Sequence, residues 1–196
     1  NMQYQDGELL FSPSDLVNYT RSPFISWMDR WATETPEIKK FKDEPDAMLA
    51  YLAGKGYEHE DAFLDVLRAQ YQTITVIDVD NTTKATQVQA TLAAMHAGAD
   101  VIFQARLTHE AFAGYADFLV KVETPSDLGR YSYEPWDTKL AKSPKAYFII
   151  QLCCYAEMLE AIQGTLPQSL TVVLGTQEKA QYRTLDFYAY YQRVKR

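Results

Sequence analysis

The sequence predicts a mixed α/β (α+β) domain, with a central mixed sheet flanked by helices and an N-terminal helical segment. Alternating or β-branched residues at 101–107, 113–123 and 131–141 read as three consecutive strands separated by polar or Pro/Gly-bearing turns. Helical patterns stand on either side of them, at 83–100 and 144–163. Helices before and after such a run of strands are typical of a sheet covered by helices.

Residues 1–70 are predicted to be mainly helical. Pro23 is expected to break the first helical stretch, because proline cannot continue a helix. The segment 43–71 reads as mostly helical, and Gly54 and Gly56 are expected to interrupt it.

The remaining strands are predicted at 73–79, 169–175 and 182–190. We therefore expect a single domain over 1–196, with its core in 71–196. The chain stops in what reads as the opening of another helix, which predicts a domain excised from a longer protein.

Composition narrows the class of protein. The chain has 196 residues, of which 47% are hydrophobic and 23% charged, and no apolar run approaches the roughly 20 residues that cross a bilayer. We expect a cytoplasmic protein without membrane contact. A net charge of −7 argues against a protein that coats DNA broadly, although a local basic groove is compatible with it. The only cysteines, Cys153 and Cys154, are adjacent, which excludes a disulfide framework and a four-cysteine metal site.

An acid–lysine pair distinguishes the segment 131–141. Alternation along a strand puts residues i and i+2 on one face, so Asp137 and Lys139 are expected side by side. Asp117 lies on the preceding strand, and pairing of the two strands would bring it towards Asp137. Adjacent carboxylates repel unless a cation lies between them, and such oxygen ligands suit Mg²⁺ or Mn²⁺. This combination favours metal-assisted phosphodiester hydrolysis.

The same residues also have a simpler interpretation. Asp137 and Lys139 can form a surface ion pair, which contributes little to stability. Asp117 can pair with Lys121 on its own strand. A buried carboxylate without a partner is costly, however, and this cost argues for a specific role of Asp117.

Two helical motifs accompany the acids. His59 and Glu60 lie on the second predicted helix, where the imidazole can add a nitrogen ligand. Gln151 and Tyr155 are spaced i and i+4, on one face of the helix that follows the acid–lysine strand. Each residue also has a simpler interpretation. His59 can be an ordinary helix histidine, and Glu60 can be a solvated carboxylate or one that supports a ligand without binding the metal. Gln151 can be an exposed helix residue, and Tyr155 can belong to the core.

These motifs, taken in order, resemble a known family. Gly56-x-x-His59-Glu60, Gly114-x-x-Asp117, Asp137-x-Lys139 and Gln151-x-x-x-Tyr155 are similar to the motifs of the RecB-type nucleases of the PD-(D/E)XK superfamily. The nearest branch is that of the RecB-like nucleases often fused to RNase H-like or helicase regions. The resemblance covers nearly the whole chain and implies a restriction-endonuclease-like αβββαβ core.

The resemblance also implies roles for single residues. His59, Asp117 and Asp137 would bind Mg²⁺ or Mn²⁺, together with the backbone carbonyl of Thr138. Lys139 would be the catalytic lysine. Gln151 and Tyr155 would support it or contact DNA, with Glu60 beside them. Several relatives hold an iron–sulfur cluster with four cysteines, and no such cluster is expected here.

The functional expectation is a metal-dependent deoxyribonuclease, most simply an exonuclease acting on single-stranded DNA or DNA ends. A basic rim of Lys121, Lys142 and Lys145 would help to hold the strand. The alternative is a catalytically silent DNA-binding module that recruits DNA for a fused or associated helicase or RNase H-like domain. A metal-binding scaffold without nucleic acid is a third interpretation.

Overall fold

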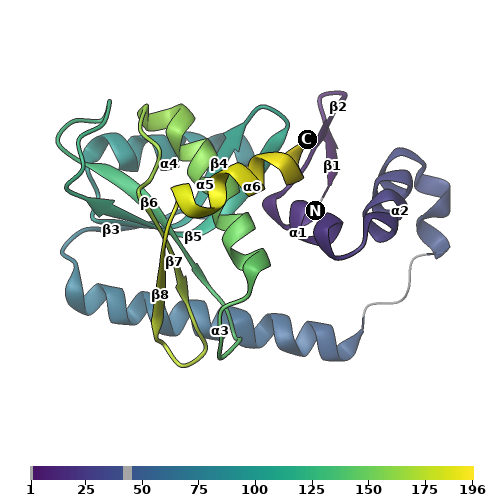
Figure 1. The fold of residues 1–196 in the computed structure, drawn as a ribbon, viewed down its shortest axis with the longest axis horizontal. Helices are drawn as coiled ribbons and strands as arrows, with labels where there is room; N and C mark the ends of the chain where they lie inside the picture. Colours follow the sequence, from purple (N-terminus) through teal and green to yellow (C-terminus); the bar gives the residue numbers. More distant parts are fainter. Residues whose placement is uncertain (1, 42–45) are drawn as a thin grey trace.

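The computed structural model describes residues 2–41 and 46–196. Its centre is a six-stranded mixed sheet, in which the strands neighbour one another in sequence order from β3 to β8 (Figure 1). The β3–β4 and β6–β7 pairs are parallel, and the other pairs are antiparallel. The strands are β3 (Ile74–Val76), β4 (Val101–His109), β5 (Phe112–Val122), β6 (Ser132–Thr138), β7 (Ser169–Val173) and β8 (Lys179–Arg183).

Helices cover both faces of the sheet. Figure 1 shows α3 along one side of the strands, with α4, α5 and α6 on the other. A single helix thus faces a group of helices across the sheet. The helices are α1 (Pro13–Arg21), α2 (Pro23–Glu34), α3 (Ala47–Gln70), α4 (Lys84–Ala97), α5 (Ala146–Gln163) and α6 (Leu185–Lys195), with a short 3-10 helix at Pro36–Phe41.

Each face of the sheet has its own apolar core. On the α3 side, Phe63 and Leu67 pack against Phe118 and Phe103 of the sheet. On the other side, α5 is the central helix, and its buried residues include both cysteines, which are free. The two cores hold α3 and α5 on opposite sides of β5 and β6, so side chains from both helices can reach the same strands.

The structure corrects two of the predicted elements. α3 runs without interruption through Gly54 and Gly56, and residues 43–45 of the predicted segment lie outside the described residues. Neither glycine has a positive φ or a close neighbour, so the helix tolerates both at a modest entropic cost. The predicted strand 182–190 is wrong beyond Arg183, because α6 starts at Leu185.

Tertiary packing explains the second error. The aromatic residues of α6 have high strand propensity, but Tyr191 is fully buried in the core around α5 and Tyr188 packs beside it. These positions recur at helical spacing. Local propensity therefore favours a strand, and burial on one face selects a helix.

A short hairpin precedes α1 and was not predicted. β1 (Gln3–Gln5) pairs with β2 (Glu8–Leu10) through Asp6 and Gly7, both at positive φ. Asp-Gly between two short runs is a strong hairpin signal, so this element was available from the sequence.

Gly114 allows the helices to approach β5. A Cβ atom at Gly114 would lie 2.7 Å from Cδ of Pro13 at the start of α1 and 3.1 Å from the hydroxyl oxygen of Tyr155 on α5. The first distance is shorter than real Cβ contacts. The glycine of the Gly114-x-x-Asp117 motif thus has a packing explanation.

We predict opposite effects for two glycine replacements. Gly114→Ala is expected to lower the free energy of unfolding by roughly 1–3 kcal/mol, because Pro13 or Tyr155 must shift. Gly56→Ala, in open space within α3, is expected to raise it by up to about 1 kcal/mol. Urea denaturation of the two variants checks both signs, and a stable Gly114→Ala protein would contradict the packing.

Candidate active site

The register of β5 and β6 places two carboxylates opposite each other. Phe118 pairs with Trp136 in the antiparallel ladder, so the next step along the strands sets Asp117 against Asp137. Asp137 is almost completely buried, with 2% of its surface exposed. Burial and the neighbouring charge of Asp137 raise the pKa of Asp117 well above its usual range.

Thr138, the last residue of β6, holds the side chain of Asp117 through two hydrogen bonds. Oδ2 of Asp117 accepts hydrogen bonds from the backbone N–H of Thr138 at 2.7 Å and from its hydroxyl at 2.9 Å. The residue whose carbonyl was predicted to bind a metal is therefore held against one of the predicted ligands.

Lys139 contacts Asp137, as the sequence predicted. β6 ends at Thr138, so Lys139 lies just beyond it, with its backbone N–H bonded to the Val173 carbonyl at 2.9 Å. Its Nζ atom lies 2.7 Å from Oδ2 of Asp137. This contact lacks hydrogen-bond geometry, and Oδ2 has no hydrogen-bond donor among the described residues. A buried carboxylate oxygen thus depends on one cation.

The acids hold Lys139 in its charged form. Burial alone would lower the pKa of Lys139, but the attraction of Asp137 and then Asp117 outweighs it and raises the pKa. A lysine that stays protonated can stabilise negative charge, whereas it is a poor base.

The backbone after Lys139 is fixed by a second glycine. A Cβ atom at Gly175 would lie 2.3 Å from the carbonyl oxygen of Leu140, and the Gly175 N–H donates to the Ala141 carbonyl at 3.0 Å. This close approach ties the segment that carries Lys139 to the end of β7.

Glu60 approaches the acids from α3. Its Oε2 atom accepts a hydrogen bond of 2.6 Å from Nε2 of Gln104 on β4. Burial, followed by repulsion from Asp137, raises the pKa of Glu60 to about 7. Glu60, Asp117 and Asp137 are therefore electrostatically linked, which gives Glu60 a more central place than the sequence suggested.

Sequence reasoning missed Gln104. It stands in a strand of mostly buried residues and has a φ of 57°, which is uncommon for any residue except glycine. Its polar side chain within a buried apolar strand was a signal that something polar lies opposite.

His59 lies next to the backbone of the segment that carries Thr138 and Lys139. Its Nε2 atom lies 3.5 Å from the backbone carbonyl of Val173 on β7. The same carbonyl accepts a hydrogen bond from the backbone N–H of Lys139 at 2.9 Å, so the imidazole lies close to the acid–lysine segment. In the part of the chain that the structure describes, no three His, Cys, Asp or Glu side chains lie close enough together to hold a metal ion. The ligand role of His59 stays a prediction of the resemblance.

The two supporting residues on α5 contact the site directly. Oε1 of Gln151 accepts a hydrogen bond of 3.1 Å from Nζ of Lys139. Tyr155 is buried, and its hydroxyl donates to the backbone carbonyl of Tyr115 at 2.5 Å. Gln151 is therefore placed to orient the lysine, and Tyr155 anchors α5 to β5 close to Asp117.

Several charges near the motifs have other partners. Lys121 pairs with Asp100 at 2.9 Å and does not pair with Asp117. Glu134 accepts a hydrogen bond from the Ser169 backbone N–H at 2.9 Å. The simpler interpretation of Asp117 thus fails, and Lys121 does not contribute a free charge to a basic rim, whereas Lys142 and Lys145 are exposed.

Comparisons with known proteins add no assignment. No protein-family model matches the chain, and no curated protein matches it significantly. Among the described residues, no helix is long and apolar enough to cross a membrane.

We predict opposite stability effects for two aspartates. Asp117→Asn removes the negative charge that Asp137 repels, and its amide oxygen can still accept the hydrogen bonds from Thr138. Without metal, this variant should therefore raise the free energy of unfolding by about 1 kcal/mol at neutral pH. Asp100→Asn should lower it by about 1 kcal/mol, because Lys121 and the Thr73 N–H hold the pKa of Asp100 at about 2.

The direction of the pKa shift of each aspartate determines whether its replacement raises or lowers the free energy of unfolding. A lowered pKa means that Asp100 stabilises the fold above its unfolded pKa, and this contribution is lost as the pH falls through about 2. A raised pKa means that ionised Asp117 costs stability above its unfolded pKa. Denaturation in EDTA measures both, and destabilisation by Asp117→Asn would contradict the strain assigned to the site.

Proposed function

We propose that the chain is a Mg²⁺- or Mn²⁺-dependent deoxyribonuclease domain of RecB type. The observation that carries the proposal is the cluster of Glu60, Asp117, Asp137 and Lys139, in which acids from a helix and two strands surround one charged lysine. A carboxylate–lysine cluster of this kind suits phosphodiester hydrolysis, because it can bind a cation and offset the charge that develops on a phosphate. We expect exonuclease action on single-stranded DNA or DNA ends.

The order of elements supports the same proposal. The run α4–β4–β5–β6–α5–β7 follows the αβββαβ order that the resemblance implies, and it carries Asp117 on β5, Asp137 on β6 and Gln151 on α5. We therefore propose a restriction-endonuclease-like core within the mixed sheet.

The acids fit a divalent cation. Oδ2 of Asp137 is buried without a hydrogen-bond donor among the residues described, and burial followed by repulsion from Asp137 raises the pKa values of Asp117 and Glu60. Asp117 and Asp137, set opposite each other by the strand register, would hold the ion, and Glu60 would add negative charge from α3. Oxygen donors of this kind suit Mg²⁺ or Mn²⁺. When bound, the ion supplies Lewis acidity towards the phosphate and its attacking water.

The protein's own side chains would stabilise the transition state and position the acids. Lys139, held in its charged form, would stabilise the negative charge of the phosphate in the transition state. Gln151 would keep the ammonium directed towards the acids, and Gln104 would orient Glu60. Thr138 would fix Asp117 through two hydrogen bonds.

The decisive experiment is cleavage of end-labelled single- and double-stranded DNA with Mn²⁺, Mg²⁺ or EDTA. We expect metal-dependent cutting, a product ladder that reveals the polarity, and a loss of at least about 100-fold in Lys139→Ala. Lys55→Ala is the matched control, since Lys55 is an exposed lysine of α3 that pairs with Glu58.

A loss of cleavage caused by unfolding must be distinguished from a loss of catalysis in a folded variant. Lys139→Ala leaves the Asp137 carboxylate buried without its cation, which can destabilise the protein by about 3–5 kcal/mol. The double variant Asp137→Asn/Lys139→Met removes both charges and should fold without cutting. Unchanged cleavage in a folded Lys139 variant would overturn the role of the lysine. DNA binding without any cleavage by the unaltered protein would favour the recruitment module.

Metal affinity should rise with pH. Glu60, with a pKa of about 7, adds its negative charge beside the two aspartates only after it loses its proton, so Mn²⁺ should bind more tightly at pH 8 than at pH 6, by up to about tenfold per unit below the pKa. Calorimetry with Mn²⁺ alone measures this slope. Glu60→Gln should flatten the slope and Asp100→Asn should leave it unchanged, whereas a pH-independent affinity would exclude a contribution of the Glu60 charge to metal binding.

A further inference from the structure

A second charged group lies buried near the site, with no ion-pair partner among the described residues. Arg106 on β4 is 5% exposed, and its Nε atom has no hydrogen-bond acceptor among the described residues. No carboxylate in the described part of the chain forms an ion pair with it. A guanidinium cannot lose its proton to escape the cost of burial. The fold therefore retains a buried cation that nothing in the described chain neutralises.

The surroundings hold Arg106 in place. Its guanidinium carbon lies 4.7 Å from the centre of the Tyr115 ring, and the Tyr115 hydroxyl donates to Oε1 of Gln87 on α4. Its backbone N–H donates to Oγ1 of Thr91 at 3.0 Å. Stacking orients the guanidinium and leaves its N–H groups available for an acceptor.

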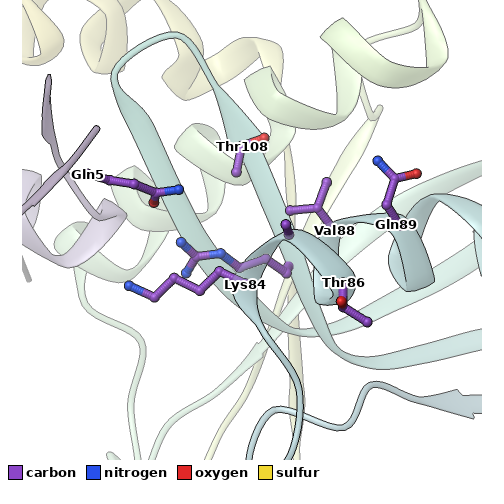
Figure 2. Close-up of a pocket in the computed structure, with 8 residues that line it drawn as sticks. Gln5, Lys84, Thr86, Val88, Gln89 and Thr108 are labelled. Carbon is purple, nitrogen blue, oxygen red and sulfur yellow. The ribbon is translucent and has the colours of Figure 1, made fainter. Parts of the chain in front are cut away.

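Arg106 lines a pocket of about 510 Å³ between α4, β4 and the N-terminal hairpin. Figure 2 shows Lys84 and Gln5 reaching towards this space from α4 and from β1. Of the residues described around the pocket, two are cations and none is acidic, in a protein of net charge −7. The lining consists of Gln5, Lys84, Ala85, Thr86, Val88, Gln89, Arg106 and Thr108.

The start of α4 adds to the positive potential. Lys84, Ala85 and Thr86 form the first turn of this 14-residue helix, where backbone N–H groups point outward and the helix dipole favours an anion. The N-cap Thr83 satisfies the N–H of Thr86. The helix start, Lys84 and the unpartnered Arg106 thus converge on one concave surface.

Along the strands, the pocket begins two residues from the candidate active site, on the face of the sheet that α4 covers, whereas Glu60 comes from α3 on the other face. Arg106 pairs with Tyr115, which is two residues from Asp117 on β5, and Arg106 is itself two residues from Gln104, which contacts Glu60. Two strand residues span about 7 Å. A nucleic-acid strand bound at the acids could reach this pocket with another of its phosphates.

We propose that the Arg106 pocket binds a backbone phosphate of the DNA strand, at a position away from the bond that is cut. The chemistry required is that of a phosphate group, which Arg106 would bind through its free N–H groups. Lys84 would bind it through its ammonium, which in the structure also donates to Oε1 of Gln3 on β1. The identity of the strand rests on the proposed function, whereas the anion site itself rests on the geometry of the pocket.

The test is binding of a short single-stranded oligonucleotide in EDTA, followed by fluorescence anisotropy, so that no cutting is needed. Lys84→Ala should weaken binding about tenfold and reduce the slope of log affinity against log salt by about 0.7. Arg106→Gln should weaken it at least as much, and Lys84→Arg should retain it. Arg130→Ala, an exposed cation in the β5–β6 loop, is the matched control and should bind normally.

A second arm distinguishes the source of the phosphate. Stabilisation of the protein by inorganic pyrophosphate is measured on the same variants. If pyrophosphate stabilises the unaltered protein but not Lys84→Ala, while oligonucleotide affinity is unchanged, the assignment to a DNA strand is overturned. If neither probe distinguishes the variants, the anion site is overturned. Lys84 is exposed, so its variants should fold even if Arg106→Gln does not, and the outcome does not depend on whether the protein cuts DNA.

Discussion

The antiparallel pairing of β5 with β6 is the constraint on which the site depends. This register sets Asp117 against Asp137 inside the sheet, and a shift by one residue would turn every buried side chain of a strand to the other face. The apolar cores on both faces therefore enforce a contact that the two carboxylates oppose. Thr138, at the end of β6, and Lys139, just after it, offset the repulsion between the carboxylates. Thr138 donates a hydrogen bond to Asp117, and Lys139 forms an ion pair with Asp137.

Positioning of the site is divided between the two faces of the sheet. Glu60 arrives from α3 and Gln151 from α5, so the acids and the lysine are held by helices that belong to different cores. Gly114 and Gly175 allow the close approaches that complete this arrangement. Buried carboxylates with raised pKa values cost stability, which is the pattern expected where a fold retains groups for function.

Patterns of hydrophobicity predicted the strands from β4 to β7 and helices α4 and α5 well, because these elements are buried on one face or both. The same patterns failed for α6, where aromatic residues favoured a strand locally and packing against α5 selected a helix. The contact of Asp137 with Lys139 was predicted, although the strand ends before the lysine. Gln104 and Arg106 are polar residues within an apolar strand, which was a signal, but their partners Glu60 and Tyr115 could not be predicted because neighbouring residues do not indicate what lies across the sheet.

The uninterrupted course of α3 has a mechanical consequence. A helix of 24 residues is about 36 Å long, and its packing against the sheet is concentrated at Phe63, Leu64 and Leu67 in its second half. Met48 and Tyr51, in its first half, are exposed. Glu60 lies near the boundary between the two halves. A force that bends the exposed first half of α3 would therefore displace Glu60 before it displaces the packed residues around Phe63.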